Sequence, residues 1–196
     1  LIAASESTPF AKTGGLADVI GSLPKELMKQ EIDVRVILPK YQDIPDEFKA
    51  KMNMQARFTV RIGQKDVHCC IESIKHHGVT FYFVGNGGYF NRSGLYGYWD
   101  DGERFAFFSR AIIEGLPHLC FKPDIVHCND WHTAMTIVLL ETQYAHHPFF
   151  KDVKTVFTIH NLQYQGIFPR EILGLFGMGD EYFNPEQLEF YNMVNF

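Results

Sequence analysis

Apolar residues recur along this chain at two spacings, and these spacings separate helices from strands. A repeat of three to four positions indicates a helix that buries one face, whereas a short continuous run indicates a strand buried on both faces. The predicted helices are Leu16–Leu27, Glu103–Gly115 and Trp131–Tyr144, and the predicted strands are Leu1–Ala4, Asp33–Leu38, Asp124–Cys128 and Val153–Ile159. Because strands alternate with helices, we expect an α/β fold with a doubly wound, mainly parallel, Rossmann-like sheet.

Two of these elements carry more specific predictions. Pro24 lies inside the first helical pattern, so we expect this helix to kink there or to restart at Ser22. The run Val153–Ile159 is apolar almost throughout, which is typical of a strand at the centre of a parallel sheet.

Residues 40–102 break the alternation of strands and helices. Apolar residues alternate over 58–62 and 67–71, a third run covers 80–84, and turn residues separate the three. We therefore expect a β-meander or a pair of hairpins inserted at the sheet edge. The glycine- and tyrosine-rich stretch 85–101 is expected to be a long loop, and such loops are commonly functional or mobile.

The composition indicates a globular chain and limits its partners. Of 196 residues, 46% are hydrophobic and 15% aromatic, enough for one domain with a large core or for two small ones. The net charge of −5 and the lack of a basic stripe argue against nucleic acid. No apolar run reaches the length of a membrane span, and no basic leader precedes the first strand. The four cysteines form no C-x-x-C pair, so we expect reduced thiols and a cytoplasmic location.

A turn with two glycines joins the first strand to the first helix. Lys12 and Thr13 precede Gly14 and Gly15, and the helix follows at once. Amide donors at a helix N-terminus, the close approach that glycine permits and the charge of Lys12 together suit a phosphate group. The turn is neither a P-loop, because the lysine precedes the glycines, nor the dinucleotide fingerprint, because the glycines are adjacent. Glycines in such turns also serve packing alone, and that alternative stays open.

Polar residues follow two further strands at their carboxyl ends. Asn129–His132 comes after the strand Asp124–Cys128, and His160–Gly166 comes after Val153–Ile159. The carboxyl ends of parallel strands share one rim of a sheet. We therefore expect the three turns to converge at a topological switch point, which is where doubly wound sheets bind ligands.

Several of these residues have alternative roles. Asp130 stands where the helix Trp131–Tyr144 needs an N-cap. His127, Asp130 and His132 are of metal-ligand type, but we expect His127 to point into the core and no metal to bind. His160 alone is equally consistent with a histidine that hydrogen-bonds backbone. Aromatic residues of the long loop either cover the core or stack on sugar rings, namely Tyr89, Tyr96, Tyr98 and Trp99.

Four segments together resemble the family of bacterial glycogen synthases and plant starch synthases. The segment Ala4–Pro24 is similar to the opening of these enzymes, and His127–Thr133 and Phe157–Gly166 are similar to two further signatures. Gly94–Tyr98 together with Glu103–Phe108 adds a fourth. The resemblance covers essentially the whole chain, and the order and spacing of the segments also match.

The resemblance implies a two-domain, GT-B-like, retaining glycosyltransferase whose halves face each other across a cleft. Residues 1–196 would be the N-terminal, acceptor-side domain, incomplete at both ends, and the C-terminal nucleotide-binding domain would be missing. The family transfers glucose from ADP-glucose (UDP-glucose in some members) to the non-reducing end of an α-1,4-glucan in glycogen biosynthesis, and it needs no metal or other cofactor. We expect the fragment alone to be inactive.

The resemblance also implies roles for single residues. The substrate-binding residues would be Lys12, Gly14, Gly15, Asp18, Tyr96 and Asn161, and the catalytic residues would be Asp130 and His160. The first four lie at or near the donor pyrophosphate, and the others face the transferred glucose. Transfer places negative charge on the leaving diphosphate, which a lysine and helix-terminal amides stabilise, and positive charge on the sugar, which Asp130 or the His160 carbonyl offsets.

Two other functions remain open on the sequence alone. A non-catalytic glucan- or anion-binding module would need no second domain, and a different glycosyltransferase of the same fold would use another sugar nucleotide. The apolar stretch Leu188–Phe196 ends without a cap, which favours an enzyme fragment over a complete module.

Overall fold

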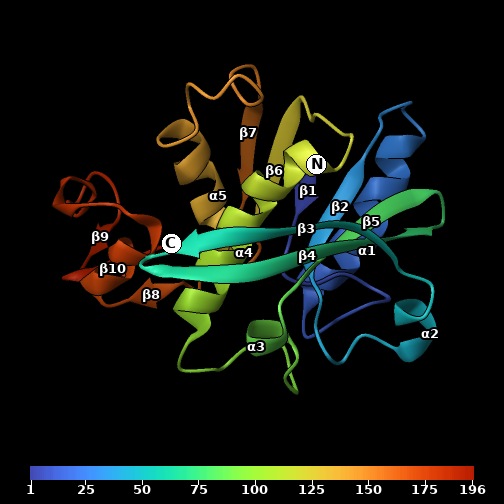
Figure 1. The fold of residues 1–196 in the computed structure, drawn as a ribbon, viewed down its shortest axis with the longest axis horizontal. Helices are drawn as coiled ribbons and strands as arrows, with labels where there is room; N and C mark the ends of the chain where they lie inside the picture. Colours follow the sequence, from blue (N-terminus) through green and yellow to red (C-terminus); the bar gives the residue numbers. More distant parts are fainter.

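The computed structural model describes residues 1–196 and builds them around a seven-stranded sheet in the order β3-β4-β5-β2-β1-β6-β7 (Figure 1). The strands of this sheet are β1 (Ile2–Ala3), β2 (Arg35–Pro39), β3 (Asn53–Ile62), β4 (Lys65–His76), β5 (Val79–Gly85), β6 (Ile125–Asn129) and β7 (Lys154–Thr158). A small second sheet is ordered β8-β10-β9 and consists of β8 (Ile167–Phe168), β9 (Glu189–Phe190) and β10 (Met193–Asn195).

Five α-helices and three 3₁₀ turns connect the strands. The α-helices are α1 (Gly15–Met28), α2 (Asp46–Lys49), α3 (Gly87–Phe90), α4 (Asp101–Gly115) and α5 (Trp131–Glu141), and the 3₁₀ turns are η1 (Leu116–His118), η2 (Arg170–Phe176) and η3 (Asp180–Tyr182). None of these helices is both long and apolar enough to cross a bilayer.

The centre of the large sheet is parallel, as the alternation of strands and helices predicts. Strands β5, β2, β1, β6 and β7 pair in parallel, and the chain turns from β1 to β2 on one side and later to β6 on the other. Right-handed crossovers then place α1 on one face, and α4 and α5, which pack together, on the opposite face. The predicted doubly wound α/β fold is confirmed, with its switch point between β1 and β6.

The predicted meander is also confirmed, with one refinement. β3 and β4 pair antiparallel, as do β4 and β5, but β5 also pairs parallel with β2 through Val36 and Phe81. The insertion is therefore the long hairpin β3–β4, and its third strand belongs to the parallel sheet. The hairpin tip reaches the C-terminal part of the chain (Figure 1), where the Gly63 amide donates to the carbonyl of Leu175 at 2.9 Å. The predicted loop 85–101 contains the short helix α3.

Helix α4 is buried on nearly all sides because it lies among the sheet, α5 and the β3–β4 hairpin. Phe105, Phe107 and Phe108 are each fully buried, and each burial stabilises the fold by roughly 2 kcal/mol. The helix approaches the hairpin closely at Gly115, where an added Cβ would lie 2.4 Å from Cδ1 of Ile71. The face of the hairpin that carries Phe58 and Ile71 therefore packs against α4, and the alternate residues of β3 and β4 point away from this helix.

Of the two alternatives predicted at Pro24, a kink or a restart at Ser22, the restart is wrong. Helix α1 runs without interruption from Gly15 to Met28 with Pro24 inside it. A proline in a helix interior costs about 3 kcal/mol. Ile20, Gly21 and Pro24 are all buried, so packing of this face outweighs the cost.

The prediction that Val153–Ile159 forms a central strand is wrong for this chain. β7 is the outermost strand, and within residues 1–196 it pairs with β6 alone. Val156 and Phe157 are 43% and 42% exposed. The apolar run indicates that the strand can be buried on both faces. In residues 1–196, however, helix α5 covers β7 from one side, and no strand pairs with its free edge.

Candidate active site

The carboxyl ends of β1, β6 and β7 meet at one rim, as expected from a parallel sheet. The pairs Ala3 with Cys128 and Asn129 with Thr158 bring the three strand ends level. The amide of Asn129 then ties them together, because its Nδ2 donates to the carbonyl of Ala3 at 3.1 Å and its Oδ1 lies 2.9 Å from Nε2 of His160. Asn129 is fully buried, so this connection is shielded from water.

Asp130 does not cap the helix that it precedes. It occupies the N-cap position of α5, yet its side chain makes no capping hydrogen bond, so the capping interpretation is wrong. Its Oδ1 instead accepts a hydrogen bond from the backbone amide of His160 at 2.7 Å. The backbone at Asp130 has φ 58° and ψ 173°, a conformation that costs a non-glycine residue about 1–3 kcal/mol and that concentrates at functional sites.

His160 is fixed by its ring and leaves its carbonyl free. Both hydrogens of the Asn129 amide go to carbonyl oxygens, so its Oδ1 is an acceptor and Nε2 of His160 donates to it. The backbone carbonyl of His160 accepts no backbone hydrogen bond. The adjoining Asn161 is exposed, and its Oδ1 accepts from the amide of Gln163 at 2.9 Å.

A cavity of about 290 Å³ opens at this rim, and it contains part of the predicted site. Asp130 and Asn161 line it together with apolar side chains that include Trp131 and Leu162. The remaining predicted residues lie outside its lining: Lys12, Gly14, Gly15, Asp18, Tyr96 and His160.

The Lys12 turn is open to solvent. Nζ of Lys12 lies 2.7 Å from both carboxylate oxygens of Asp18, and the two side chains are 51% and 57% exposed. Exposed pairs of this kind contribute at most about 1 kcal/mol, so another anion can replace Asp18 at low cost. A Cβ added at Gly15 would meet nothing within 4 Å, and at Gly14 it would lie 3.7 Å from Oε1 of Glu6. Packing therefore does not account for the two glycines.

The histidines near this rim do not join Asp130 in a ligand cluster. His127 is half-buried rather than in the core, and its Nε2 lies 2.7 Å from Oγ1 of Thr158. His132 is buried against Trp131, and burial together with the charge of Arg104 lowers its pKa to about 3. Within residues 1–196, no three His, Cys, Asp or Glu side chains come together in a metal-binding group.

Comparison with known proteins identifies the family. A family model described as the starch synthase catalytic domain matches residues 1–196. The chain belongs to this family. It is 57% identical over 197 residues to the glycogen synthase of Desulforamulus reducens and 56% identical to that of Alkaliphilus metalliredigens. Each alignment covers 100% of this chain but 41% and 42% of the relative, so the chain spans about two-fifths of the length of these relatives.

The fold agrees with a solved structure from the same family. The catalytic domain of starch synthase IV from Arabidopsis thaliana, bound to ADP and acarbose, superposes with a TM-score of 0.90 at 31% identity. The match covers 99% of this chain and 41% of that chain. The resemblance inferred from the motifs is therefore confirmed, both in family and in fold.

The structure adds Glu6, to which sequence reasoning gave no role, to the family's glycine turn. Glu6 is 4% exposed, and its Oε2 accepts from the backbone amide of Thr13 at 2.5 Å and from the Thr13 hydroxyl at 2.9 Å. It thus fixes the turn between Lys12 and Gly14. Its position directly after β1 was the one sequence feature that could have indicated a role for Glu6. The hydrogen bonds to Thr13 form only in the folded turn, so they could not be predicted.

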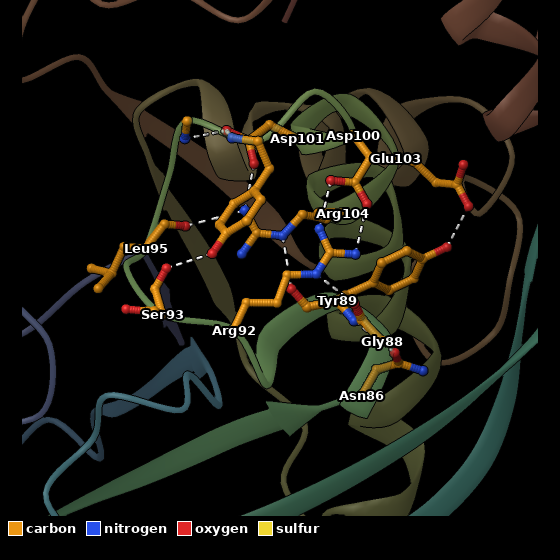
Figure 2. Close-up of polar contacts among 12 residues, drawn as sticks. Asn86, Gly88, Tyr89, Arg92, Ser93, Leu95, Asp100, Asp101, Glu103 and Arg104 are labelled. Carbon is orange, nitrogen blue, oxygen red and sulfur yellow. Dashed lines mark hydrogen bonds and ion pairs between the residues drawn. The ribbon is translucent and has the colours of Figure 1, made fainter.

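A second group missed by sequence reasoning holds the loop that carries Tyr96 (Figure 2). Arg104 of α4 is fully buried, donates to the carbonyls of Tyr89 and Leu95 at 2.8 and 3.2 Å, and forms an ion pair with Asp101. Oδ2 of Asp101 in turn accepts from the backbone amide of Gly97 at 2.8 Å. A buried cation and its carboxylate therefore fix the backbone on both sides of Tyr96.

Tyr96 itself connects this loop to the rim. Its hydroxyl donates to Oγ of Ser5 at 2.7 Å, and its ring packs 4.6 Å from that of His132. Burial and the nearby charge of Glu6 raise the pKa of Tyr96 far above its usual range. Of the other loop aromatics, Tyr89 is buried in the core and Trp99 is 94% exposed.

Proposed function

We propose that the full-length protein is a glycogen synthase that transfers glucose from ADP-glucose to the non-reducing end of an α-1,4-glucan with retention at the anomeric carbon. The observation that carries the proposal is the connection of the ends of β1, β6 and β7 through Asn129 and Asp130 at the switch point, in a chain 57% identical to a glycogen synthase. The ADP bound to the Arabidopsis relative favours an adenine nucleotide over a uridine nucleotide as donor.

The Lys12 turn is proposed to bind the donor diphosphate. The amides at the start of α1 point outward from Gly14 and Gly15, and the open space beside Gly15 leaves room for phosphate oxygens. Lys12 exchanges its exposed partner Asp18 for the diphosphate. Each preorganised donor aimed at the growing negative charge contributes roughly 3 kcal/mol to stabilising the transition state.

The Asp130–His160 pair is proposed to face the transferred glucose. The bond between the anomeric carbon and the phosphate oxygen breaks, ADP leaves with the electron pair, and an acceptor hydroxyl forms the new glycosidic bond as its proton passes to the leaving phosphate. The sugar gains positive charge as that bond breaks. The carboxylate of Asp130 and the free carbonyl of His160 offset this charge, while Asn161 and Tyr96 position the sugar.

Residues 1–196 are proposed to be the acceptor-side domain, completed by a C-terminal nucleotide-binding domain that is its partner in the reaction. The coverage of about 41% of the relatives supports this division. So does the exposed apolar surface of β7, including Phe157 at 42% exposure, which suits burial by further chain. We place the reaction in the cytoplasm, consistent with the four unpaired cysteines.

The test is transfer of labelled glucose by the full-length protein to maltooligosaccharide. Lys12→Ala and His160→Ala should each reduce kcat/KM with ADP-glucose by about 100-fold or more. Lys29→Ala and His146→Ala serve as matched controls, because both side chains are exposed and neither lines the cavity at the rim. The controls should retain the activity of the unmodified protein.

Two results would contradict parts of the proposal. Undiminished transfer in both Lys12→Ala and His160→Ala would remove the site assignment. Transfer from another sugar nucleotide with none from ADP-glucose would instead favour a different glycosyltransferase of the same fold.

A further inference from the structure

A second cavity is lined by none of the residues assigned to glucose transfer. It has a volume of about 700 Å³, and residues at the carboxyl ends of β2 and β5 and on the β3–β4 hairpin line it. It lies on the hairpin face that points away from α4, because Arg57 and Cys70 form a cross-strand pair that alternates with Phe58 and Ile71. The polar side chains that matter here are Lys40, Lys49, Arg57, Thr59, His68 and Asn91.

The cavity carries an uncompensated positive charge. Nζ of Lys40 lies 2.6 Å from Oε2 of Glu72, and Nζ of Lys49 lies 2.8 Å from Oδ1 of Asp46. Arg57 is exposed, and its guanidinium forms no hydrogen bond or ion pair within residues 1–196. Lys40 and Lys49 are thus each paired with a carboxylate, and Arg57 is the third cation, which has no partner.

Lys40 and Arg57 both lie beside Cys70, which is part of the cavity lining. A Cβ built on Gly85 would lie 2.6 Å from Sγ of Cys70 and 3.6 Å from Cδ of Lys40, so the lysine stem passes beside the thiol. Arg57 pairs with Cys70 across the hairpin. Burial and the charge of Glu72 raise the pKa of the Cys70 thiol, whereas Lys40 and Arg57 act to lower it, as expected if both cations and the carboxylate paired with Lys40 lie near the sulfur.

The lining favours an anion with hydroxyl groups over a neutral glucan. A guanidinium without a carboxylate partner is a ready donor pair for phosphate oxygens, and neutral amides and hydroxyls suit sugar hydroxyls. A glucan site needs an open aromatic face for stacking. Here Tyr41 is 1% exposed, and the ring of Phe58 stacks on His118.

We propose that this cavity binds a small phosphorylated sugar, with Arg57 and Lys40 on the phosphate and Thr59, Asn91 and neighbouring amides on the hydroxyls. Its volume is within the range of small-ligand pockets and exceeds the need of a bare phosphate ion. No residue of the glycine turn lines this cavity, and its existence does not depend on the proposed transfer reaction.

The experiment is calorimetric titration of the full-length protein with glucose 1-phosphate, glucose or inorganic phosphate. We expect saturable one-site binding of glucose 1-phosphate that weakens as ionic strength rises, weaker binding of inorganic phosphate and no binding of glucose. Arg57→Gln should weaken binding of glucose 1-phosphate at least tenfold. Arg61→Gln, an exposed arginine on the same strand that pairs with Asp66, should leave the affinity unchanged.

The variant Lys12→Gln separates this cavity from the glycine turn. Binding lost in Lys12→Gln but kept in Arg57→Gln would place the phosphate at the proposed donor site and overturn the proposal. Saturable binding of glucose with the same affinity as glucose 1-phosphate, insensitive to Arg57→Gln, would overturn its ligand class. Absence of saturable binding by glucose 1-phosphate would overturn it outright, whatever the activity of the protein in glucose transfer.

Discussion

Replacing Arg104 by methionine should open the loop that carries Tyr96. The substitution leaves the carboxylate of Asp101 without its cation, and the carbonyls of Tyr89 and Leu95 lose their donors. Breaking a buried ion pair costs about 3–5 kcal/mol, and each orphaned carbonyl costs about 1 kcal/mol more where water cannot reach it. Because the loop relaxes toward solvent and recovers part of this, we expect a net loss of about 4 kcal/mol.

Amide hydrogen exchange of the full-length protein, followed by mass spectrometry, measures this loss locally. The amides of Gly97 and Tyr98 donate to Asp101, so their exchange reports on the network. A loss of about 4 kcal/mol corresponds to exchange roughly 1,000-fold faster, since each 1.4 kcal/mol is a factor of ten. The exchange rate of Arg104→Lys should lie between those of Arg104→Met and the unmodified protein, because an ammonium group reaches Asp101 but does not reproduce the planar fork of the guanidinium.

An exposed arginine provides the control. Arg61→Met removes a pair with Asp66 whose side chains are 51% and 66% exposed, so it should change stability by less than about 1 kcal/mol. Exchange in residues 94–101 of Arg104→Met that stays within threefold of the unmodified protein would refute the reasoning. It would mean that the loop is held by packing alone.

Two further predictions test the rim. Gly15→Ala should leave the melting temperature unchanged, because the added methyl group meets nothing within 4 Å. It should raise KM for ADP-glucose at least tenfold, because the methyl group occupies the space proposed for the diphosphate. Gly174→Ala, where the added methyl group in η2 is equally free of contacts, is the control, and an unchanged KM in Gly15→Ala would count against the diphosphate site. The pKa of His132 is lowered from 6.5 to about 3, so the unfolded chain takes up a proton that the folded protein refuses. The contribution of His132 to the free energy of unfolding should therefore be complete above pH 6.5, and it should decrease toward pH 3 by up to about 1.4 kcal/mol per pH unit. In thermal melts recorded across this pH range, His132→Gln should show a smaller decrease in stability. An equally steep decrease in the variant would show that other groups cause it.

The sequence predicts the arrangement of the rim because that arrangement follows from chain topology. Parallel strands end at the same edge, so polar residues after β1, β6 and β7 must meet there whatever their side chains do. The hydrogen bond from the His160 amide to Asp130 is a direct consequence of that meeting. Helical and strand spacing sufficed to reach this point.

Features that depend on distant partners were not predictable in the same way. The N-cap position of Asp130 is a local fact, but the carboxylate binds an amide thirty residues away, and no local pattern encodes that choice. Arg104 reads as an ordinary charged residue in a helix until tertiary packing buries it. The edge position of β7 is a third case. An apolar run indicates that a strand can be buried, but it does not indicate which neighbouring elements cover the strand.

The two halves of the proposed site differ in how firmly the chain holds them, and the difference matches their proposed tasks. Asn129 is fully buried and fixes the His160 ring, so the groups proposed to face the sugar are positioned before any ligand arrives. Lys12 is half-exposed and held by one exposed carboxylate, so its charge remains available to an incoming anion. Preorganisation is most valuable where positive charge develops on carbon in the transition state, because a group that must move then contributes less. A diphosphate carries its charge already in the ground state, and a mobile lysine is sufficient to bind it.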